Sequence, residues 1–204
     1  MSIQKVTKLT EKEYLEIERK AEFKSEYYDG EMFSLAGASL EHNRISKNIT
    51  KSLNNQLNNK PCESFQSDLK IKEQSSGLFT YPDIVVICGE PEFYDKEKDT
   101  IVNPIVLMEV LSPSTEGYDR GFKFELYRKI KSLKGYLIIS QKQISIEYFT
   151  RNADESWNLK EYNVKNQSID IKSINCSLDL NEVYYNVKFN IDLVNEQQNN
   201  LLTK

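Results

Sequence analysis

Short apolar runs separated by polar turns follow the chain from about residue 65 to about residue 140. Four of them predict strands: "FQSDLKIK" (65–72), "YPDIVVIC" (81–88), "NPIVLMEVL" (103–111) and "GYLIIS" (135–140). Between the last two runs, apolar residues at helical spacing predict an amphipathic helix over 118–133, namely Phe122, Leu126, Ile130 and Leu133. A strand, a helix and a second buried strand in this order predict a crossover connection and a partly parallel sheet.

The N-terminal third contains signals for two helices and one hairpin. Thr10 and Glu13 form a capping box that opens a helix, and Asp29-Gly30 is a type I′ turn pair between two aromatic-rich segments. From His42 onward a four-residue spacing predicts a second helix, with Ile45, Ile49, Leu53 and Leu57 on its apolar side. After the fourth strand, the segments 144–151, 156–163 and 168–173 alternate apolar and polar residues and predict a meander.

Composition describes an ordinary water-soluble globular chain. The 204 residues are 39% hydrophobic and 28% charged, and no apolar stretch approaches the roughly 20 residues of a membrane span. We expect one domain over 1–204, with a polar, frayed tail from about residue 195. The N-terminus has no apolar segment of a signal peptide, and the three separated cysteines favour reduced thiols over a disulfide framework or a zinc site. We therefore expect a cytoplasmic protein.

Two of the predicted strands carry an acid inside an apolar run, Asp83 in "YPDIVVI" and Glu109 in "VLMEVL". An unpaired charge in a buried strand costs several kcal/mol, on the order of the transfer penalty for polar groups. If the strands are neighbours, a hard divalent ion such as Mg²⁺ between the carboxylates would remove the conflict. Alternatively, each acid pairs with Lys or Arg in a structural ion pair, or Asp83 simply follows Pro82 at a strand edge.

The predicted helix over 118–133 adds candidate chemistry. Asp119, Lys123 and Tyr127 are four residues apart, so Asp119 can hold the Lys123 ammonium, and Tyr127 can position that ammonium or a substrate phosphate. The stretch from Asp119 to Lys134 is locally basic within a chain of net charge -4 and pI about 5.3. Together with the basic flank of the His42 helix it could contact phosphates, although a solvated charged face has the same pattern.

The strings "YPD", "MEVLSPST" and "YDRGFKFELYRK", with the earlier "YYDGEMFSLAGASLEHNRI", resemble the Uma-type restriction endonucleases, a branch of the PD-(D/E)xK nuclease superfamily. The resemblance implies an α/β (α+β) restriction-endonuclease-like core, a central mixed sheet flanked by helices. It also implies Mg²⁺ or Mn²⁺ bound by Asp83 and Glu109, and a lysine, matched here by Lys123, that activates the attacking water. The implied function is a metal-dependent DNA endonuclease that hydrolyses phosphodiester bonds.

One position departs from the wider superfamily. Its lysine stands two residues after the second acid, where this chain has Leu111. Leucine can neither orient water nor balance phosphate charge. Two hypotheses follow: an active enzyme whose lysine has moved to the helix as Lys123, or a catalytically inactive binding module that keeps the nuclease fold.

The resemblance also suggests supporting residues and partners. Glu31, after the hairpin turn, is expected as a third carboxylate near the metal. His42 is a supporting candidate, and Asp68, on the strand before Asp83, is expected to support the site or form an ion pair. We expect double-stranded DNA as the substrate and a homodimer, because nucleases that cut both strands commonly pair two copies of one active site.

Overall fold

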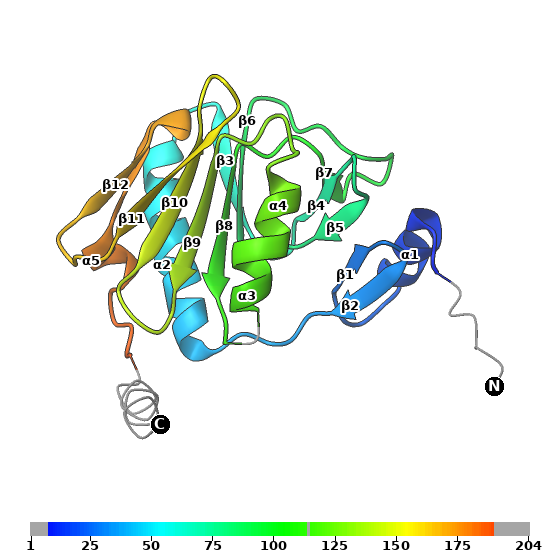
Figure 1. Ribbon diagram of the computed structural model, residues 1–204, viewed down its shortest axis with the longest axis horizontal. Coiled ribbons are helices and arrows are strands. Elements are labelled where there is room, and N and C mark those ends of the chain that lie inside the picture. Colours follow the sequence, from blue (N-terminus) through cyan, green and yellow to red (C-terminus); the bar gives the residue numbers. More distant parts are fainter. Residues whose placement is uncertain (1–7, 114, 190–204) are drawn as a thin grey trace.

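The computed structural model describes residues 8–113 and 115–189. The tail expected from about residue 195 lies outside the described residues. Two mixed sheets dominate this part of the chain, with helices packed against them (Figure 1). The predicted α/β architecture with a mixed sheet is therefore confirmed.

The larger sheet forms the centre of the molecule. Its strands, in spatial order, are β11 (Trp157–Tyr162), β10 (Ile146–Arg151), β9 (Gly135–Ser140), β8 (Val106–Leu111), β6 (Ile84–Cys88) and β3 (Cys62–Gln66). β8 and β9 are parallel, as the strand-helix-strand order predicted, and the other neighbours are antiparallel.

The smaller sheet contains the N-terminal hairpin. Its spatial order is β2 (Glu31–Ser34), β1 (Ser25–Tyr28), β5 (Leu78–Thr80), β4 (Lys70–Glu73) and β7 (Thr100–Ile101). A two-stranded ribbon of β12 (Ser168–Ile171) and β13 (Cys176–Asp179) follows the meander. The helical elements are α1 (Glu11–Glu18), α2 (Leu40–Leu57), α3 (Glu116–Tyr118), the π-helical turn η1 (Asp119–Lys123), α4 (Phe124–Tyr127), the 3₁₀ turn η2 (Lys172–Ile174) and α5 (Leu180–Val183).

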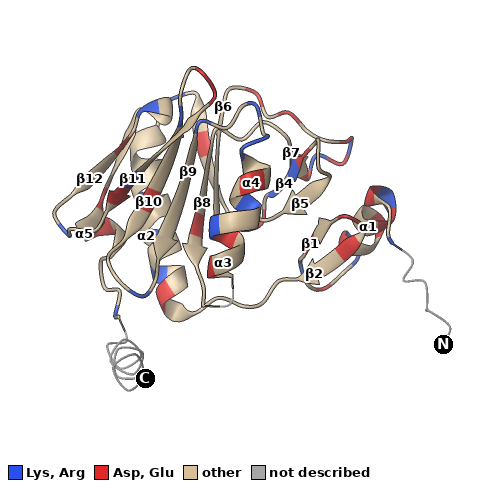
Figure 2. Cartoon of the chain, viewed as in Figure 1, with Lys and Arg blue, Asp and Glu red and all other residues tan. Residues whose placement is uncertain are grey.

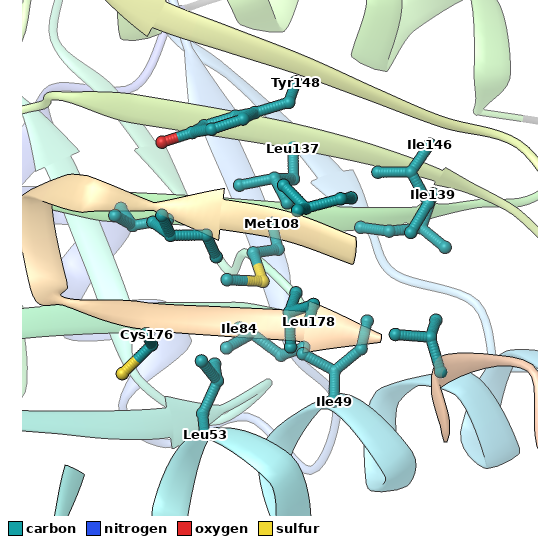
Figure 3. Packing of buried hydrophobic residues seen from close by; sticks show 14 of the residues in the cluster. Ile49, Leu53, Ile84, Met108, Leu137, Ile139, Ile146, Tyr148, Cys176 and Leu178 are labelled. Carbon is teal, nitrogen blue, oxygen red and sulfur yellow. The ribbon is translucent and has the colours of Figure 1, made fainter. Parts of the chain in front are cut away.

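Strand periodicity divides the core into two layers on opposite faces of the larger sheet. On β8 the even-numbered residues Val106, Met108 and Val110 join the cluster that packs against α2 and the β12–β13 ribbon (Figure 3). Leu107 and Leu111 instead face the cluster under α4 and the smaller sheet. Successive strand residues point to opposite faces, so Glu109 shares the second face with Leu107 and Leu111.

Local sequence signals account for the helix starts and the hairpin. The Thr10–Glu13 capping box begins α1, and Ser39 caps α2 three residues before His42. The Asp29-Gly30 pair turns β1 into β2, and both residues have positive φ, as a type I′ turn requires. A Cβ at Gly30 would lie 2.5 Å from the Cβ of Lys8, so glycine is needed there for space as well as for conformation.

The prediction of one continuous strand over 65–72 is wrong. The stretch 65–72 is not continuous: it breaks after β3 and resumes as β4 in the other sheet. Ser67 at the break has φ of 25°, outside the extended region. Asp68 consequently lies in the turn between the strands rather than on a strand.

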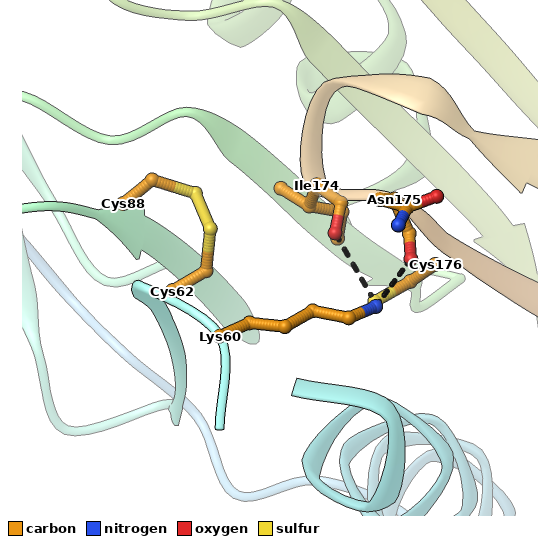
Figure 4. The surroundings of a disulfide bond; sticks show 6 residues. All are labelled: Lys60, Cys62, Cys88, Ile174, Asn175 and Cys176. Atoms are coloured by element: carbon orange, nitrogen blue, oxygen red, sulfur yellow. Dashed lines mark hydrogen bonds between the residues drawn. A yellow bond between two sulfur atoms is a disulfide. The ribbon is translucent and has the colours of Figure 1, made fainter. Parts of the chain in front are cut away.

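The expectation of three reduced cysteines is also wrong. Cys62 and Cys88 form a disulfide, and Cys176 is the free, buried thiol of the three (Figure 4). The two partners are 26 residues apart in sequence, but the antiparallel β3–β6 register sets them directly opposite, with a Cα–Cα distance of 4.0 Å. Because disulfides are rare in the cytosol, this pair removes one support for the expected cytoplasmic location.

The disulfide gives a first testable outcome. Denatured, unreduced protein should titrate one thiol per chain, and the Cys62→Ser/Cys88→Ser variant should lose about 3 kcal/mol of unfolding free energy, because the cross-link restricts the unfolded chain. Urea titration monitored by fluorescence measures the loss. Wild type treated with a reductant is the matched control. Three titratable thiols in protein purified without reductant would contradict the pairing.

Among the described residues, no helix is long and apolar enough to span a membrane.

Candidate active site

Asp83 and Glu109 each accept a hydrogen bond from main chain at or next to the other residue. Asp83 lies immediately before β6, whose Ile84 pairs with Met108 on β8. The main-chain N–H of Val110 donates to Asp83 Oδ2 at 2.7 Å, and the N–H of Asp83 donates to Glu109 Oε2 at 3.3 Å. The structure therefore brings together the two predicted acids by direct strand pairing.

Lys123 reaches Glu109 from the π-helical turn η1. Its ammonium Nζ lies 3.0 Å from Glu109 Oε1, 3.0 Å from Glu26 Oε1 and 3.4 Å from Asp119 Oδ1. Lys123 is 5% exposed and Glu109 is 4% exposed. π-helical turns recur at functional sites because they re-aim side chains within a helix. The relocated lysine postulated from the sequence is thus in contact with the second acid.

Tyr127 has a different partner from the one expected. Its hydroxyl donates to Glu109 Oε1 at 2.9 Å, and the ring is fully buried. It therefore orients the carboxylate and not the Lys123 ammonium. Leu111, where the wider superfamily has lysine, is buried in the apolar layer under α4.

Glu26 is the acid that sequence reasoning missed. This β1 residue is buried, binds Lys123 and accepts a hydrogen bond from the Thr80 hydroxyl. Glu31, the acid expected here, is not among the acids that contact Lys123: it is exposed at the start of β2, opposite Tyr28 at the turn end of the hairpin. The reason is the hairpin geometry, because Glu31 lies at the turn whereas Glu26 lies toward the open end, beside η1. The only signal was an acid beside two tyrosines in the predicted hairpin strand.

His42 contacts Asp83 from the first turn of α2. Its Nε2 lies 3.0 Å from Asp83 Oδ2, the same oxygen that accepts from Val110. Because a carboxylate accepts hydrogen bonds, Nε2 carries a proton in this pair. Nδ1 is buried and has no hydrogen-bond partner. His42 and the Val110 N–H therefore hold the same oxygen of Asp83.

Asp68 forms a surface ion pair, one of the two roles considered for it. It binds Lys24 at 2.8 Å and its side chain is 87% exposed. Two side chains of the predicted basic surface also pair with acids: Arg44 binds Glu41, and Arg120 binds Glu147. Figure 2 shows that basic and acidic positions are both spread over many elements, and that the helix running from α3 to α4 beside β8 carries both.

Burial and charge together set the protonation of the cluster. Burial raises the pKa of the Glu109 carboxyl to about 8, against the opposing effect of Lys123. Burial likewise raises the pKa of Asp119. Burial alone would lower the pKa of Lys123, but Glu109 and the other acids around it raise that pKa well above its usual range. The lysine is therefore charged, and the surplus negative charge of the cluster favours a further cation, either a proton or a metal.

These groups line a cleft of about 750 Å³ between the two sheets. Its described charged lining residues are five acids and two lysines: Glu22, Glu26, Asp83, Glu109, Asp119, Lys24 and Lys123. His42, Tyr81 and Gln141 also contribute to its walls. A phosphate that enters this cleft meets net negative charge, so its binding needs an additional cation.

The donor set fits Mg²⁺ or Mn²⁺. Among the described residues, no group of three or more His, Cys, Asp or Glu side chains is arranged as a metal cage. Mg²⁺ does not need one, since it usually binds one or two carboxylates and keeps several waters. Asp83 and Glu109 supply two carboxylates of the required oxygen chemistry. Of the ligand types that zinc prefers, the described cleft lining contains one histidine, His42, and no cysteine.

A mixed sheet with acids on two neighbouring strands and a lysine from the next helix defines a restriction-endonuclease-like fold. A crystal structure from Anabaena variabilis, titled as "a putative nuclease belonging to DUF820", shares this fold with a TM-score of 0.70 at 16% identity, over 86% of this chain and 97% of that one. Residues 11–181 match the family Uma2, described as "Putative restriction endonuclease". The chain belongs to this family, as the sequence resemblance predicted.

Two relatives from Synechocystis sp. are similar over most of their length. The uncharacterized protein sll1609 is 38% identical over 162 residues, which is 79% of this chain and 92% of that protein. The uncharacterized protein slr1290 is 35% identical over 182 residues, which is 89% of this chain and 94% of that protein.

Proposed function

We propose that this protein is a Mg²⁺- or Mn²⁺-dependent endonuclease that hydrolyses phosphodiester bonds in DNA. The observation that carries the proposal is the 3.0 Å contact between the Lys123 ammonium and Glu109, a carboxylate that is itself bonded to the main chain of Asp83. Two acids and a lysine within one cleft are the groups that metal-assisted hydrolysis of a phosphodiester requires. The family description supports the same class of reaction.

Each residue has a defined part in this proposal. Asp83 and Glu109, with the main-chain carbonyl of Val110, hold the divalent ion, which when bound supplies Lewis acidity at the scissile phosphate. Lys123 donates a hydrogen bond to the attacking water and stabilises charge that develops on the phosphate. Water oxygen bonds to phosphorus as the water gives up a proton to bulk solvent, the bond from phosphorus to the 3′ oxygen breaks, and that oxygen takes a proton from solvent. The products are a 5′-phosphate and a 3′-hydroxyl.

Glu26 and Asp119 support Lys123 and are positioning residues. With Glu109 they hold its ammonium by three carboxylate contacts. His42 and the Val110 N–H orient Asp83 in the same way. The apolar Leu111 is compatible with this arrangement, because the lysine reaches Glu109 from the helix and not from β8.

The test is DNA cleavage with Mg²⁺ or Mn²⁺ by wild type beside Asp83→Asn. We expect the variant to lose more than about 100-fold in rate, because loss of groups that only support a metal ligand already costs about 10- to 100-fold. Asp68→Asn, at a surface ion pair outside the cluster, is the matched control and should cut like wild type. Equal cutting by all three proteins would assign the activity to a contaminant.

The inactive-module hypothesis makes the opposite prediction for the metal. Leu111 motivates it, since the wider superfamily has lysine at that position. An inactive module would show no Mn²⁺ binding by calorimetry and no thermal stabilisation by Mn²⁺. Wild type that binds Mn²⁺ while Asp83→Asn does not would exclude it.

A further inference from the structure

One rim of the cleft is apolar. Phe23, in the loop between α1 and β1, lines the cleft and is 76% exposed. Beside it runs the segment 35–38, "LAGA", which follows β2 and also lines the cleft. The Leu35 N–H donates to the Lys24 carbonyl at 3.0 Å, so the two segments form one continuous rim. A large exposed aromatic ring therefore stands at the entrance, flanked by small side chains.

This rim offers few contacts for the backbone of a duplex. The lysine of this rim is Lys24. Its ammonium already binds Asp68 and donates a hydrogen bond to the Ser67 carbonyl at 2.8 Å. Affinity for duplex DNA comes mainly from Lys and Arg contacts to phosphates. Among the described lining residues, the second lysine is Lys123, which is buried among three acids. The described lining residues at the entrance therefore offer a duplex few phosphate contacts.

The reacting groups lie deep in the cleft. Glu109 and Asp119 are each 4% exposed and Lys123 is 5% exposed. A scissile phosphate has to pass the rim to reach them. One flexible strand can bend a phosphate inward, whereas a duplex carries its second strand and paired bases along with it. Bases that are unpaired also present faces that can stack on an aromatic ring, whatever their sequence.

We propose that the cleft takes a single strand of nucleic acid and that an unpaired base stacks on Phe23 beside the scissile phosphate. This inference rests on the proposed nuclease function of the same cleft and replaces the duplex substrate expected from the sequence. A single strand needs one active site, so the expected homodimer is not required. Tyr81 also lines the cleft, but the ammonium groups of Lys24 and Lys70 already lie 5.5 and 5.6 Å from its ring centroid.

The experiment compares a labelled single-stranded oligonucleotide of about 15 nucleotides, within the range that single-strand binders cover, with the same sequence as a duplex. Cleavage in Mg²⁺ and binding by fluorescence anisotropy are measured for wild type, Phe23→Ala, Phe23→Trp and Phe93→Ala. Phe93 is 36% exposed, bridges to Ile101 and does not line the cleft, so it controls for loss of any exposed phenylalanine.

We expect wild type to cut the single strand faster than the duplex. Phe23→Ala should raise the KM for the single strand about 10-fold with little change in kcat, since stacking contributes to binding and not to the reaction. Phe23→Trp should restore the KM, and Phe93→Ala should leave it unchanged. A duplex cut as fast as the single strand, or equal KM values for the two alanine variants, would overturn this inference and leave the nuclease function intact. Neither DNA being cut by wild type would instead overturn the nuclease proposal.

Discussion

Replacing Glu109 with glutamine should abolish DNA cleavage while leaving the fold at least as stable as wild type. Glutamine keeps the size of the side chain and can still accept the Tyr127 hydrogen bond, but it loses the negative charge that a metal ligand needs. Lys123 keeps two other carboxylate partners, Glu26 and Asp119. We expect cleavage and Mn²⁺ affinity to fall by more than about 100-fold.

The stability of this variant has a predicted pH dependence. Because burial raises the pKa of Glu109 from 4.5 to about 8, the folded protein favours the neutral carboxyl. The contribution of the neutral Glu109 carboxyl to the free energy of unfolding is fully present below pH 4.5 and is lost as the pH rises toward about 8. Glutamine does not titrate, so in EDTA the stability of Glu109→Gln relative to wild type should increase across this window.

Urea unfolding at several pH values in EDTA measures this difference, and calorimetry measures Mn²⁺ binding. Glu63→Gln, at an exposed position on β3, is the matched control and should change neither quantity. If Glu109→Gln cut DNA at the wild-type rate, the Glu109 carboxylate would not be a metal ligand. If Glu109→Gln were less stable than wild type at pH 8, the neighbours of Glu109 would stabilise its ionised carboxylate by more than burial destabilises it.

The two central acids could be predicted from the sequence because their signal is local. Asp83 and Glu109 each interrupt an apolar run, and an acid in a buried strand needs a partner wherever the strand goes. The helix spacing of Asp119, Lys123 and Tyr127 is local too, and it correctly brought Lys123 to Asp119. Spacing within one helix could not identify a partner on another element. Tyr127 was therefore expected to position Lys123 or a phosphate, whereas its hydroxyl donates to Glu109 on β8.

The remaining features depend on contacts between distant segments. Glu26 joins the site because the N-terminal hairpin, in a different sheet, lies against η1, and no periodicity in the sequence encodes that docking. The Cys62–Cys88 pair depends on the register of β3 and β6 in the same way. The break at Ser67 was hidden because "FQSDLKIK" alternates like one strand although its two halves enter different sheets. Resemblance favoured Glu31 because the family also carries an acid after the hairpin turn.

Replacing Lys123 with methionine should have the largest effect on stability. Its ammonium lies 3.0, 3.0 and 3.4 Å from the buried acids Glu26, Glu109 and Asp119, and at pH 7 it chiefly compensates Glu26 and Asp119, because burial raises the pKa of Glu109 to about 8. Methionine fills much of the same volume, but it leaves those acids without that charge. Removing one partner of a buried ion pair costs about 3–5 kcal/mol, because the remaining charge stays buried and uncompensated. We expect a loss of this size in urea unfolding at pH 7, together with loss of cleavage.

A second substitution separates the structural role of Lys123 from its catalytic role. Adding Glu26→Gln to Lys123→Met removes one uncompensated acid, so stability should recover in part and the two substitutions should be strongly non-additive. Cleavage should not recover, because no other ammonium is near Glu109 to hold the water or stabilise the phosphate. Lys129→Met, at an exposed lysine shortly after α4, is the matched control and should change neither property. Recovery of cleavage in the double variant would show that Lys123 compensates charge and takes no part in the reaction.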